Sequence, residues 1–277
     1  MAGKLFVVGT PIGNLGDFSP RAAKTLAEVD FIAAEDTRVT IKLLNHFEIK
    51  KPMVSYYEHN KASKSEHIIS RILDGENCAL VTDAGMPAIS DPGTDLVALC
   101  YEHNIEVVSV PGPSAIITAA AISGMDVGRF TFEGFLTGNK PKRREHLEEV
   151  KDERRTMFFY EAPHKLAATL RDMYEFFGDR KIALIKELTK IHECVEHTTL
   201  SEAEKKYEGV KLKGEYVLII EGKKKEEVVF EEVDGITLAK QYLSEGMSIS
   251  EASKKAAKET GLKKGDIYKA LTEDKNA

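Results

Sequence analysis

The chain has 277 residues, a length that suits two domains and leaves room for a small third. Its hydrophobic fraction of 42% can build real cores, and its charged fraction of 30% is ordinary for a soluble protein. Taken alone, the formal net charge of -6 argues against a nucleic-acid partner, because RNA-binding proteins usually show a basic footprint. A local basic patch remains compatible with this total.

Cysteine usage indicates a reducing compartment. Cys78, Cys100 and Cys194 are far apart in the chain and form no CxxC pair, which disfavours both a disulfide framework and a zinc site. The apolar run at 5–8 is too short for a signal peptide and ends at Thr10-Pro11. No stretch approaches the length of a membrane span. We therefore expect a cytoplasmic protein that does not enter a membrane.

Residues 1–113 alternate between short apolar runs and amphipathic segments. The predicted strands are 5–8, 31–34, 53–56, 79–82 and 107–110. Between them, Ser19-Pro20 has the pattern of a helix cap with proline in the first turn. Two more helical patterns follow the second and third strands. This repetition predicts an α/β domain with a mostly parallel sheet that is covered on both faces.

Residues 114–222 predict a second α/β domain. It opens with an Ala- and Ile-rich segment at 114–128, and an amphipathic helix is expected at 166–177. The predicted strands are 129–133, 157–160, 182–186, 194–199 and 216–220. Because only one long helical pattern separates these runs, we expect a mixed sheet.

A charged break at 223–227 precedes a third, small domain at 232–277, which reads as helical throughout. Ser248 and Glu251 form a capping-box pattern, Gly261 ends that helix, and 266–271 starts another. A helix-turn-helix-like unit is predicted. It carries equal numbers of Lys and of acidic residues, so its charge does not indicate nucleic acid.

Three loops, each after a predicted parallel strand, are rich in Gly and Pro. They are 9–16, 83–93 and 111–114. Ligands of open α/β sheets bind at the carboxyl ends of the strands, where glycine lets the backbone approach a ligand and proline preforms the turn. Any one of these loops could be an ordinary turn. Three in one domain favour a cofactor cleft.

The first loop spaces its glycines as GxxxGxxG, which departs from the dinucleotide fingerprint GxGxxG because Pro11 occupies the second glycine position. Glu35 and Asp36 do follow the second strand, roughly where a ribose-binding acid would lie. A nicotinamide enzyme is therefore a weaker alternative. The chain has no Walker A motif, which argues against the commonest class of nucleotide hydrolase.

Several strings of residues occur in the order in which one known family carries them. They are Thr10-Pro-Ile-Gly-Asn-Leu15, Ala34-Glu-Asp-Thr-Arg38, Asp83-Ala-Gly-Met-Pro87 with Ser90-Asp-Pro-Gly93, Pro111-Gly-Pro-Ser-Ala115, Glu133-Gly-Phe-Leu136, Tyr160-Glu-Ala-Pro-His-Lys165 and Glu187-Leu-Thr-Lys190. The set resembles the ribosomal RNA small subunit methyltransferase I family, within the tetrapyrrole methylase-like superfamily. The segment 232–277 also resembles the C-terminal extension of that family.

The resemblance implies a class III methyltransferase that binds S-adenosylmethionine (AdoMet) in a cleft between its two α/β domains. It also implies a homodimer that methylates the ribose 2′-oxygen of a cytidine in the decoding centre of 16S ribosomal RNA (rRNA), in the small ribosomal subunit. Three positions depart from the usual residues: Met86 replaces Thr, Ala162 replaces Ser and Lys165 replaces Arg. Lys165 keeps the charge but lacks the planar fork of arginine.

By position in the matched strings, the resemblance assigns AdoMet contact to nine residues. They are Ile12, Ala84, Gly85, Met86, Ile89, Ser114, Ala115, Glu161 and Thr189. Many of them would act through backbone groups, so small or aliphatic side chains suffice.

A ribose hydroxyl is a poor nucleophile, and a carboxylate or histidine that takes its proton typically accelerates such a step about 10²–10⁴-fold. Asp36, Glu161 and His164 are the candidates within the matched strings. Each has an ordinary structural alternative: Asp36 as a helix cap, Glu161 as a group that only holds cofactor, and His164 as a polar residue at a helix start. No metal-ligand spacing is visible, and the reaction needs no metal.

Contact with RNA is expected from local basic groups. Lys140, Lys142, Arg143 and Arg144 cluster in what reads as a mobile loop beside the expected cleft, and Arg38 and Lys190 are further candidates for phosphate contact. A charge run of this kind is more often a solvated surface. Two other functions stay open: methylation of a small tetrapyrrole, and a ribosome-assembly factor without catalytic activity. The basic run and the helical segment favour RNA, and the intact cofactor loops argue against a pure binder.

Overall fold

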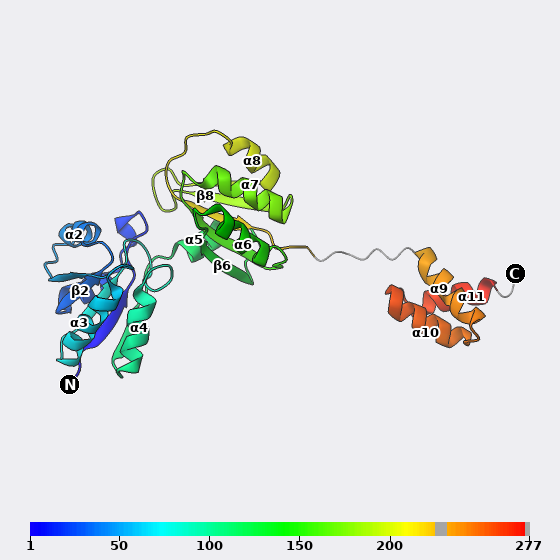
Figure 1. The fold of residues 1–277 in the computed structure, drawn as a ribbon, viewed down its shortest axis with the longest axis horizontal. Helices are drawn as coiled ribbons and strands as arrows, with labels where there is room; N and C mark the ends of the chain where they lie inside the picture. Colours follow the sequence, from blue (N-terminus) through cyan, green and yellow to red (C-terminus); the bar gives the residue numbers. More distant parts are fainter. Residues whose placement is uncertain (225–231, 275–277) are drawn as a thin grey trace. The chain divides into compact units, whose positions relative to one another are not determined.

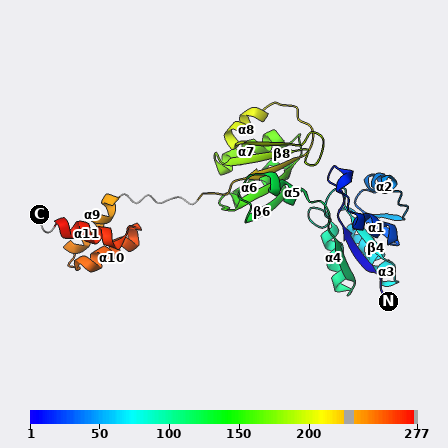
Figure 2. The same cartoon turned by 180° about the vertical axis from the view of Figure 1, so that it is seen from behind.

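The computed structural model describes residues 1–224 and 232–274, so residues 225–227 of the charged break lie outside the described residues. The chain divides into two compact units, Met1–Lys223 and Lys224–Ala277, which are described separately below. Figure 1 and Figure 2 show two sheets with helices against them in the first unit, and helices alone in the second.

The first sheet has the strand order β3-β2-β4-β1-β5, and every neighbouring pair in it is parallel. Its strands are β1 (Lys4–Val8), β2 (Phe31–Ala34), β3 (Met53–Ser55), β4 (Cys78–Val81) and β5 (Glu106–Val110). The predicted parallel α/β sheet is confirmed. Because all five strands run the same way, their carboxyl ends and the loops after them meet at one edge of the sheet.

The helices of this part are the short 3-10 helix η1 (Leu15–Asp17), α1 (Pro20–Glu28), α2 (Thr37–His46), α3 (Lys61–Leu73) and α4 (Gly93–Glu102). Side chains of β1 and β2 alternate between two buried clusters, one on each face of the sheet. Leu5 belongs to the cluster that includes residues of α3 and α4, and Val8 belongs to the cluster that includes residues of α1 and α2. Both faces of the sheet are therefore covered, as predicted. Ser19 caps α1 by accepting the N–H of Ala22, with Pro20 in the first turn.

The second sheet has the order β6-β7-β10-β8-β9 and is mixed, as predicted, because β6 and β7 are parallel and the other pairs are antiparallel. Its strands are β6 (Phe130–Phe135), β7 (Thr156–Glu161), β8 (Lys181–Lys186), β9 (Cys194–Thr199) and β10 (Tyr216–Ile220). Its helices are α5 (Ala115–Ile122), α6 (Lys140–Val150), α7 (Leu166–Phe177) and α8 (Leu200–Tyr207). The expectation of a single long helix between these strands is wrong, since α6 and α8 are also present.

One face of the second sheet packs against α6, α7 and α8, which contribute Leu147, Leu170 and Leu200 to a buried cluster. The other face packs against α5 and, from the first loop of the chain, Ile12. Burying each such aliphatic side chain contributes about 1.5–3 kcal/mol. The placement of Ile12 in this cluster brings the first strand-end loop against the second sheet.

The second unit contains α9 (Glu232–Ser244), α10 (Ile249–Thr260) and α11 (Lys264–Asp274). It has its own buried cluster of six side chains, which are Ala239, Tyr242, Ala252, Ala256, Ile267 and Leu271. The capping box of Ser248 and Glu251 is confirmed, and Gly261 ends α10. Among the described residues, none of the helices has both the length and the apolar character that crossing a lipid bilayer requires.

Candidate active site

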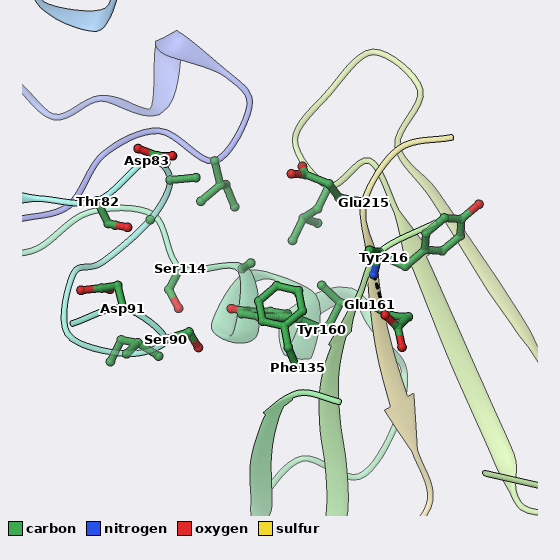
Figure 3. Close-up of a pocket in the computed structure, with 18 of the residues that line it drawn as sticks. Thr82, Asp83, Ser90, Asp91, Ser114, Phe135, Tyr160, Glu161, Glu215 and Tyr216 are labelled. Carbon is green, nitrogen blue, oxygen red and sulfur yellow. Dashed lines mark hydrogen bonds between the residues drawn. The ribbon is translucent and has the colours of Figure 1, made fainter. Parts of the chain in front are cut away.

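A cavity of about 520 Å³ lies where the strand-end loops of the first sheet face the second sheet. Every residue assigned to cofactor contact lines it except Thr189. The lining members of that set are Ile12, Ala84, Gly85, Met86, Ile89, Ser114, Ala115 and Glu161. Figure 3 shows the labelled polar residues Asp83, Ser90, Asp91 and Ser114 on one side and Phe135, Tyr160, Glu161 and Glu215 on the other. Contact between these residues and a cofactor stays a prediction.

The first two loops hold each other through their backbones. The N–H of Thr10 donates to Gly85 O at 2.9 Å, and the N–H of Gly85 donates to Thr10 O at 3.1 Å. Gly85 has φ +86, a backbone conformation that residues with side chains rarely adopt. A Cβ there would lie 3.4 Å from Ile12 Cγ2. Glycine at this position therefore sets the path of the loop along the cavity wall.

Two further cavity residues come from the second loop. Asp91 accepts the N–H groups of Ala88 at 3.0 Å and of Gly93 at 2.9 Å, which closes the loop upon itself. Burial raises the pKa of Asp91. Met86 also lines the cavity, and its side chain packs against the buried cluster between the first sheet and the helices α3 and α4.

A polar network runs from the cavity to the start of α2. Thr82 Oγ1 donates to Glu35 Oε2 at 2.5 Å, and the N–H of Asp36 donates to Asp83 Oδ1 at 3.0 Å. Burial and then the neighbouring Glu35 charge raise the pKa of Asp83. Glu35, Thr82 and Asp83 line the cavity, whereas Asp36 does not.

Asp36 acts as the N-cap of α2. Its carboxylate accepts the N–H of Arg38 at 2.8 Å and pairs with the Arg38 guanidinium at 2.6 Å. The side-chain hydrogen bond from Arg38 lowers the pKa of Asp36 to about 2. Such a carboxylate is a weak proton acceptor. The geometry therefore favours a role for Asp36 as a helix cap over a role as a base. The same contact pairs the guanidinium of Arg38, a predicted phosphate contact, with a carboxylate.

Glu161 ends β7 and is 2% exposed. Its carboxylate accepts the hydroxyl of Thr169 at 2.5 Å and the N–H of Ala162 at 2.8 Å, and Lys165 Nζ lies 3.3 Å from Oε1. These partners favour a role in holding the turn between β7 and α7. His164, in that turn, is exposed and does not line the cavity.

Thr189 lies against the first loop instead of in the cavity wall. A Cβ on Gly13 would be 3.2 Å from Thr189 Oγ1 and 2.7 Å from the Lys190 side chain. The Thr189 hydroxyl is buried without a hydrogen-bond partner among the described residues. Lys190 Nζ pairs with Glu187 at 3.0 Å and with Glu215 at 2.7 Å, so its charge is already compensated.

The expected mobile basic loop is instead the first turn of a helix, because Asn139 caps α6 by accepting the N–H of Lys142 at 3.1 Å. Arg143 is buried and pairs with Asp172 at 2.6 Å. Arg144 pairs with Asp172 and with Glu175. Lys140 and Lys142 are exposed and form no ion pair with any described residue. The free positive charge of the cluster thus resides on the two lysines.

Fourteen further residues line the cavity that are not among the nine residues assigned to AdoMet contact, although the sequence singles out Glu35 and the loop 83–93 more generally. They are Glu35, Thr82, Asp83, Ser90, Asp91, Phe135, Tyr160, Ala162, Pro163, Ile185, Leu188, Glu215, Tyr216 and Val217. Many of them lie inside the matched strings, where adjacency to a predicted contact was a usable signal. Ile185 and Val217 carry no such signal, since they meet only through the antiparallel register of β8 and β10.

Residues 4–204 match the family model of the tetrapyrrole (corrin/porphyrin) methylases. The Ribosomal RNA small subunit methyltransferase I of Synechocystis sp. is 44% identical over 273 residues, which are 98% of this chain and 98% of that protein. The protein of the same name from Thermotoga maritima is 48% identical over 221 residues, which are 80% of this chain and 99% of that protein.

Among solved structures, the uroporphyrin-III C-methyltransferase of Thermus thermophilus in complex with S-adenyl homocysteine has the same fold. It matches 78% of this chain and 97% of its own length with a TM-score of 0.55, at 14% identity. The two sheets thus have the fold of the tetrapyrrole methylases. Sequence identity over nearly the full chain identifies the family within this group. The chain belongs to the ribosomal RNA small subunit methyltransferase I family of the tetrapyrrole methylases.

Proposed function

We propose that this chain is an enzyme that uses AdoMet to methylate 16S rRNA in the small ribosomal subunit. We further propose that the acceptor is the ribose 2′-oxygen of a cytidine in the decoding centre, and that the enzyme is a cytoplasmic homodimer. The observation that carries the proposal is the 44% identity, over 98% of both chains, to a protein named for this activity. The cavity lined by the residues of the matched strings supports it.

The cavity fits a cofactor of this kind. Its volume of about 520 Å³ lies within the range of about 300–1,000 Å³ that is usual for small-molecule sites. Ile12, Ala84 and Ala115 give it apolar walls, and Ser114 and Asp83 add a hydroxyl and a carboxylate. The apolar side chains would cover flat and aliphatic parts of the ligand. A carboxylate in the wall suits a ligand that carries positive charge.

When bound, AdoMet supplies a methyl group on a positively charged sulfur, already activated for transfer. The chain's own residues then have to hold the acceptor hydroxyl in line and exclude water, and positioning of this kind can supply roughly 7–11 kcal/mol. Asp36 caps a helix, Glu161 accepts hydrogen bonds from Thr169 and Ala162, and His164 is outside the cavity. Asp83 lines the cavity with a raised pKa, which suits it better than these three to accept the ribose proton.

The proposed domains are 1–113, 114–222 and 232–277, with the third assisting the docking of the ribosomal substrate. The compact unit after Lys223, with a core of its own, supports separate folding of the third segment.

Mapping of 2′-O-methyl groups on 16S rRNA from cells with and without this chain tests the activity directly. We expect one modification to disappear without it. The cofactor is tested by thermal shift, which should respond to AdoMet or S-adenosylhomocysteine and not to NAD. Tighter binding of NAD than of AdoMet would overturn the cofactor assignment.

The match of residues 4–204 to the tetrapyrrole methylases favours one second candidate, a small tetrapyrrole acceptor. Methyl incorporation into a tetrapyrrole from labelled AdoMet, with none into small ribosomal subunits, would establish that alternative.

A further inference from the structure

Strand β6 contains a bulge that turns one aromatic side chain toward the cavity. Its register against β7 pairs Phe132 with Phe158, then Gly134 with Phe159 and Phe135 with Tyr160, so that one residue on β6 has no counterpart. Side chains alternate along a strand, and one extra residue moves every later side chain to the opposite face. Phe135 thereby shares a face with Tyr160, although an unbroken register would place it on the other.

The backbone at the bulge is specific for glycine. Gly134 has φ +67, and nothing lies within 4 Å of the position of a Cβ. The requirement is therefore conformational and not a matter of space. Leu136, which follows Phe135, is buried among the side chains of the opposite face, so the shifted alternation continues past the bulge.

The ring of Phe135 is placed where a ligand can reach it. Phe135 lines the cavity, and the residue is 57% exposed to solvent. Its centroid is 5.2 Å from that of Tyr160, which is in turn 5.0 Å from Phe132, so an aromatic row leads from the core to the cavity. Figure 3 shows the Phe135 and Tyr160 rings together, with Ser90 and Asp91 on the opposite side.

Lys165 fixes the backbone beside this ring. Its Nζ donates to Leu136 O at 3.0 Å and lies 3.3 Å from Glu161 Oε1. The same ammonium is 6.0 Å from the centroid of Phe135. Lys165 thus links the end of β6 to the end of β7 close to the ring. A ring held in this way loses little freedom when a ligand binds, which favours binding.

An exposed aromatic face selects a flat partner of similar size. Single-stranded nucleotides are commonly recognised by stacking of the base on an aromatic ring, together with contacts from basic side chains to phosphate. Lys140 and Lys142, both exposed, begin α6 on the chain segment that follows Phe135. The segment from β6 to α6 therefore presents a stacking surface and two free ammonium groups in close succession.

We propose that Phe135 is the platform on which the base of the target nucleotide stacks while its ribose enters the cavity. The inference rests on the proposed function and names the contact that positions its substrate. Enzymes that act on a base take that nucleotide out of its stack. A nucleotide whose ribose enters a cavity would lose stacking in a similar way, and an aromatic surface would replace part of it. Phe135 is in this sense a substrate-binding residue of the cavity wall.

The test compares Phe135→Ala, Phe135→Leu and Phe135→Trp in the full chain, with labelled AdoMet and small ribosomal subunits from cells that lack the enzyme. Base–aromatic stacking suggests that Phe135→Ala lowers kcat/KM for the subunit roughly 10- to 100-fold. Phe135→Leu should lose most of the same activity although it keeps apolar bulk, and Phe135→Trp should retain it. Tyr101→Ala, at a 64% exposed aromatic outside the cavity lining, is the matched control and should leave kcat/KM unchanged.

Calorimetric affinity for AdoMet and the molar mass by light scattering complete the test. Both should be unchanged in Phe135→Ala. A loss of AdoMet affinity as large as the loss of kcat/KM would assign the ring to the cofactor and overturn the proposal. A change in molar mass would assign it to contact between copies, and activity within twofold of wild type would remove its role. A wild-type chain that methylates no rRNA would contradict the proposed function itself, a result distinct from all three.

Discussion

Arg143 and Asp172 form an ion pair inside the second α/β fold, with Nη2 of the arginine 2.6 Å from Oδ2 of the aspartate and side chains only 7% and 5% exposed. A second bond, from Arg143 Nε to the same carboxylate oxygen at 2.8 Å, strengthens the contact and joins α6 to α7. A basic residue in a predicted RNA-binding run is thus part of the interior. The positive charge of Arg143 is visible in the sequence, but it is neutralised in the interior and cannot contact a ligand.

Arg143→Ala should destabilise the protein without acting on RNA binding in particular. Removing one partner of a buried ion pair typically costs about 3–5 kcal/mol, and here it leaves the Asp172 carboxylate only the longer contact of 3.3 Å with Arg144. Denaturant unfolding, followed by circular dichroism, measures this loss. Lys142→Ala, one position earlier and exposed, should shift the midpoint very little. Equal stability of the two variants would show that the pair contributes nothing to the fold.

Lys140 and Lys142 should carry the salt-dependent part of RNA binding that the basic run predicts. Each phosphate contact that is removed flattens the slope of log affinity against log salt by about one unit. The double variant Lys140→Ala, Lys142→Ala should therefore bind the subunit more weakly, with a slope smaller by about two units. AdoMet affinity should stay as in wild type, because neither lysine lines the cavity. An unchanged slope would mean that the two lysines are solvated and do not contact phosphate. The control is a double alanine variant of the exposed Lys42 and Lys50, which should leave the slope unchanged.

Asp36 and Asp83 should respond differently to replacement by asparagine. Asp36→Asn keeps a side-chain oxygen for the cap and should retain most methylation activity, whereas Asp83→Asn removes the proposed proton acceptor and should lower kcat by about 10²-fold or more. The measurement is kcat against pH for both variants and for wild type. A large fall in Asp36→Asn with none in Asp83→Asn would reverse the assignment.

The lowered pKa of Asp36, about 2, also has a consequence for stability. A carboxyl group whose pKa is lower in the folded state stabilises that state at pH values above its ordinary pKa. The contribution disappears as the pH falls through about 2. Titration of the Asp36 carboxyl by NMR should show its midpoint there, and a midpoint near 4 would mean that the Arg38 pair does not form in solution.

Gly85→Val should abolish the thermal shift that AdoMet produces. The backbone at φ +86 disfavours any side chain, and a branched one would also press on Ile12 in the cavity wall. Gly138→Ala is the control, because no heavy atom lies within 4 Å of its Cβ position and its φ is ordinary. A normal AdoMet response in Gly85→Val would mean that this loop does not bind the cofactor.

Much of the fold could be predicted from the sequence because its strands are short apolar runs between strong turn signals. The strand Phe31–Ala34 and the helix Leu166–Phe177 have the predicted bounds. Helix α4 was missed because it begins directly after Asp91-Pro92-Gly93, a string that otherwise indicates a turn, and no side chain caps it. Helix α6 was missed because its first turn is basic and its buried contacts are an arginine and a leucine.

Those parts of the site that consist of consecutive residues could be predicted from the sequence. Those parts that depend on how one strand or helix pairs with another could not. The loops after β1, β4 and β5 carry glycine and proline that local sequence reveals. The direction of the Phe135 side chain depends on a one-residue bulge, and the compensation of the Arg143 charge depends on a partner 29 positions away. Pairings of this range have no signature in a single sequence.

The three helices of the second unit enclose a core of their own. Truncation after residue 224 should leave the AdoMet response of the remaining chain intact, because the first unit alone supplies a complete cavity, lined by residues from Ile12 to Val217. The matched 221 residues of the Thermotoga maritima relative are 99% of that protein, which indicates that a chain of about this length can be complete within the family.

Methylation of the small subunit by the truncated chain should nevertheless be weaker, mainly through a higher KM, since the lost segment is proposed to assist docking. The two measurements are thermal shift with AdoMet and initial rates over a range of subunit concentrations. Loss of the AdoMet response would refute a separate domain, and an unchanged KM would remove its role in docking.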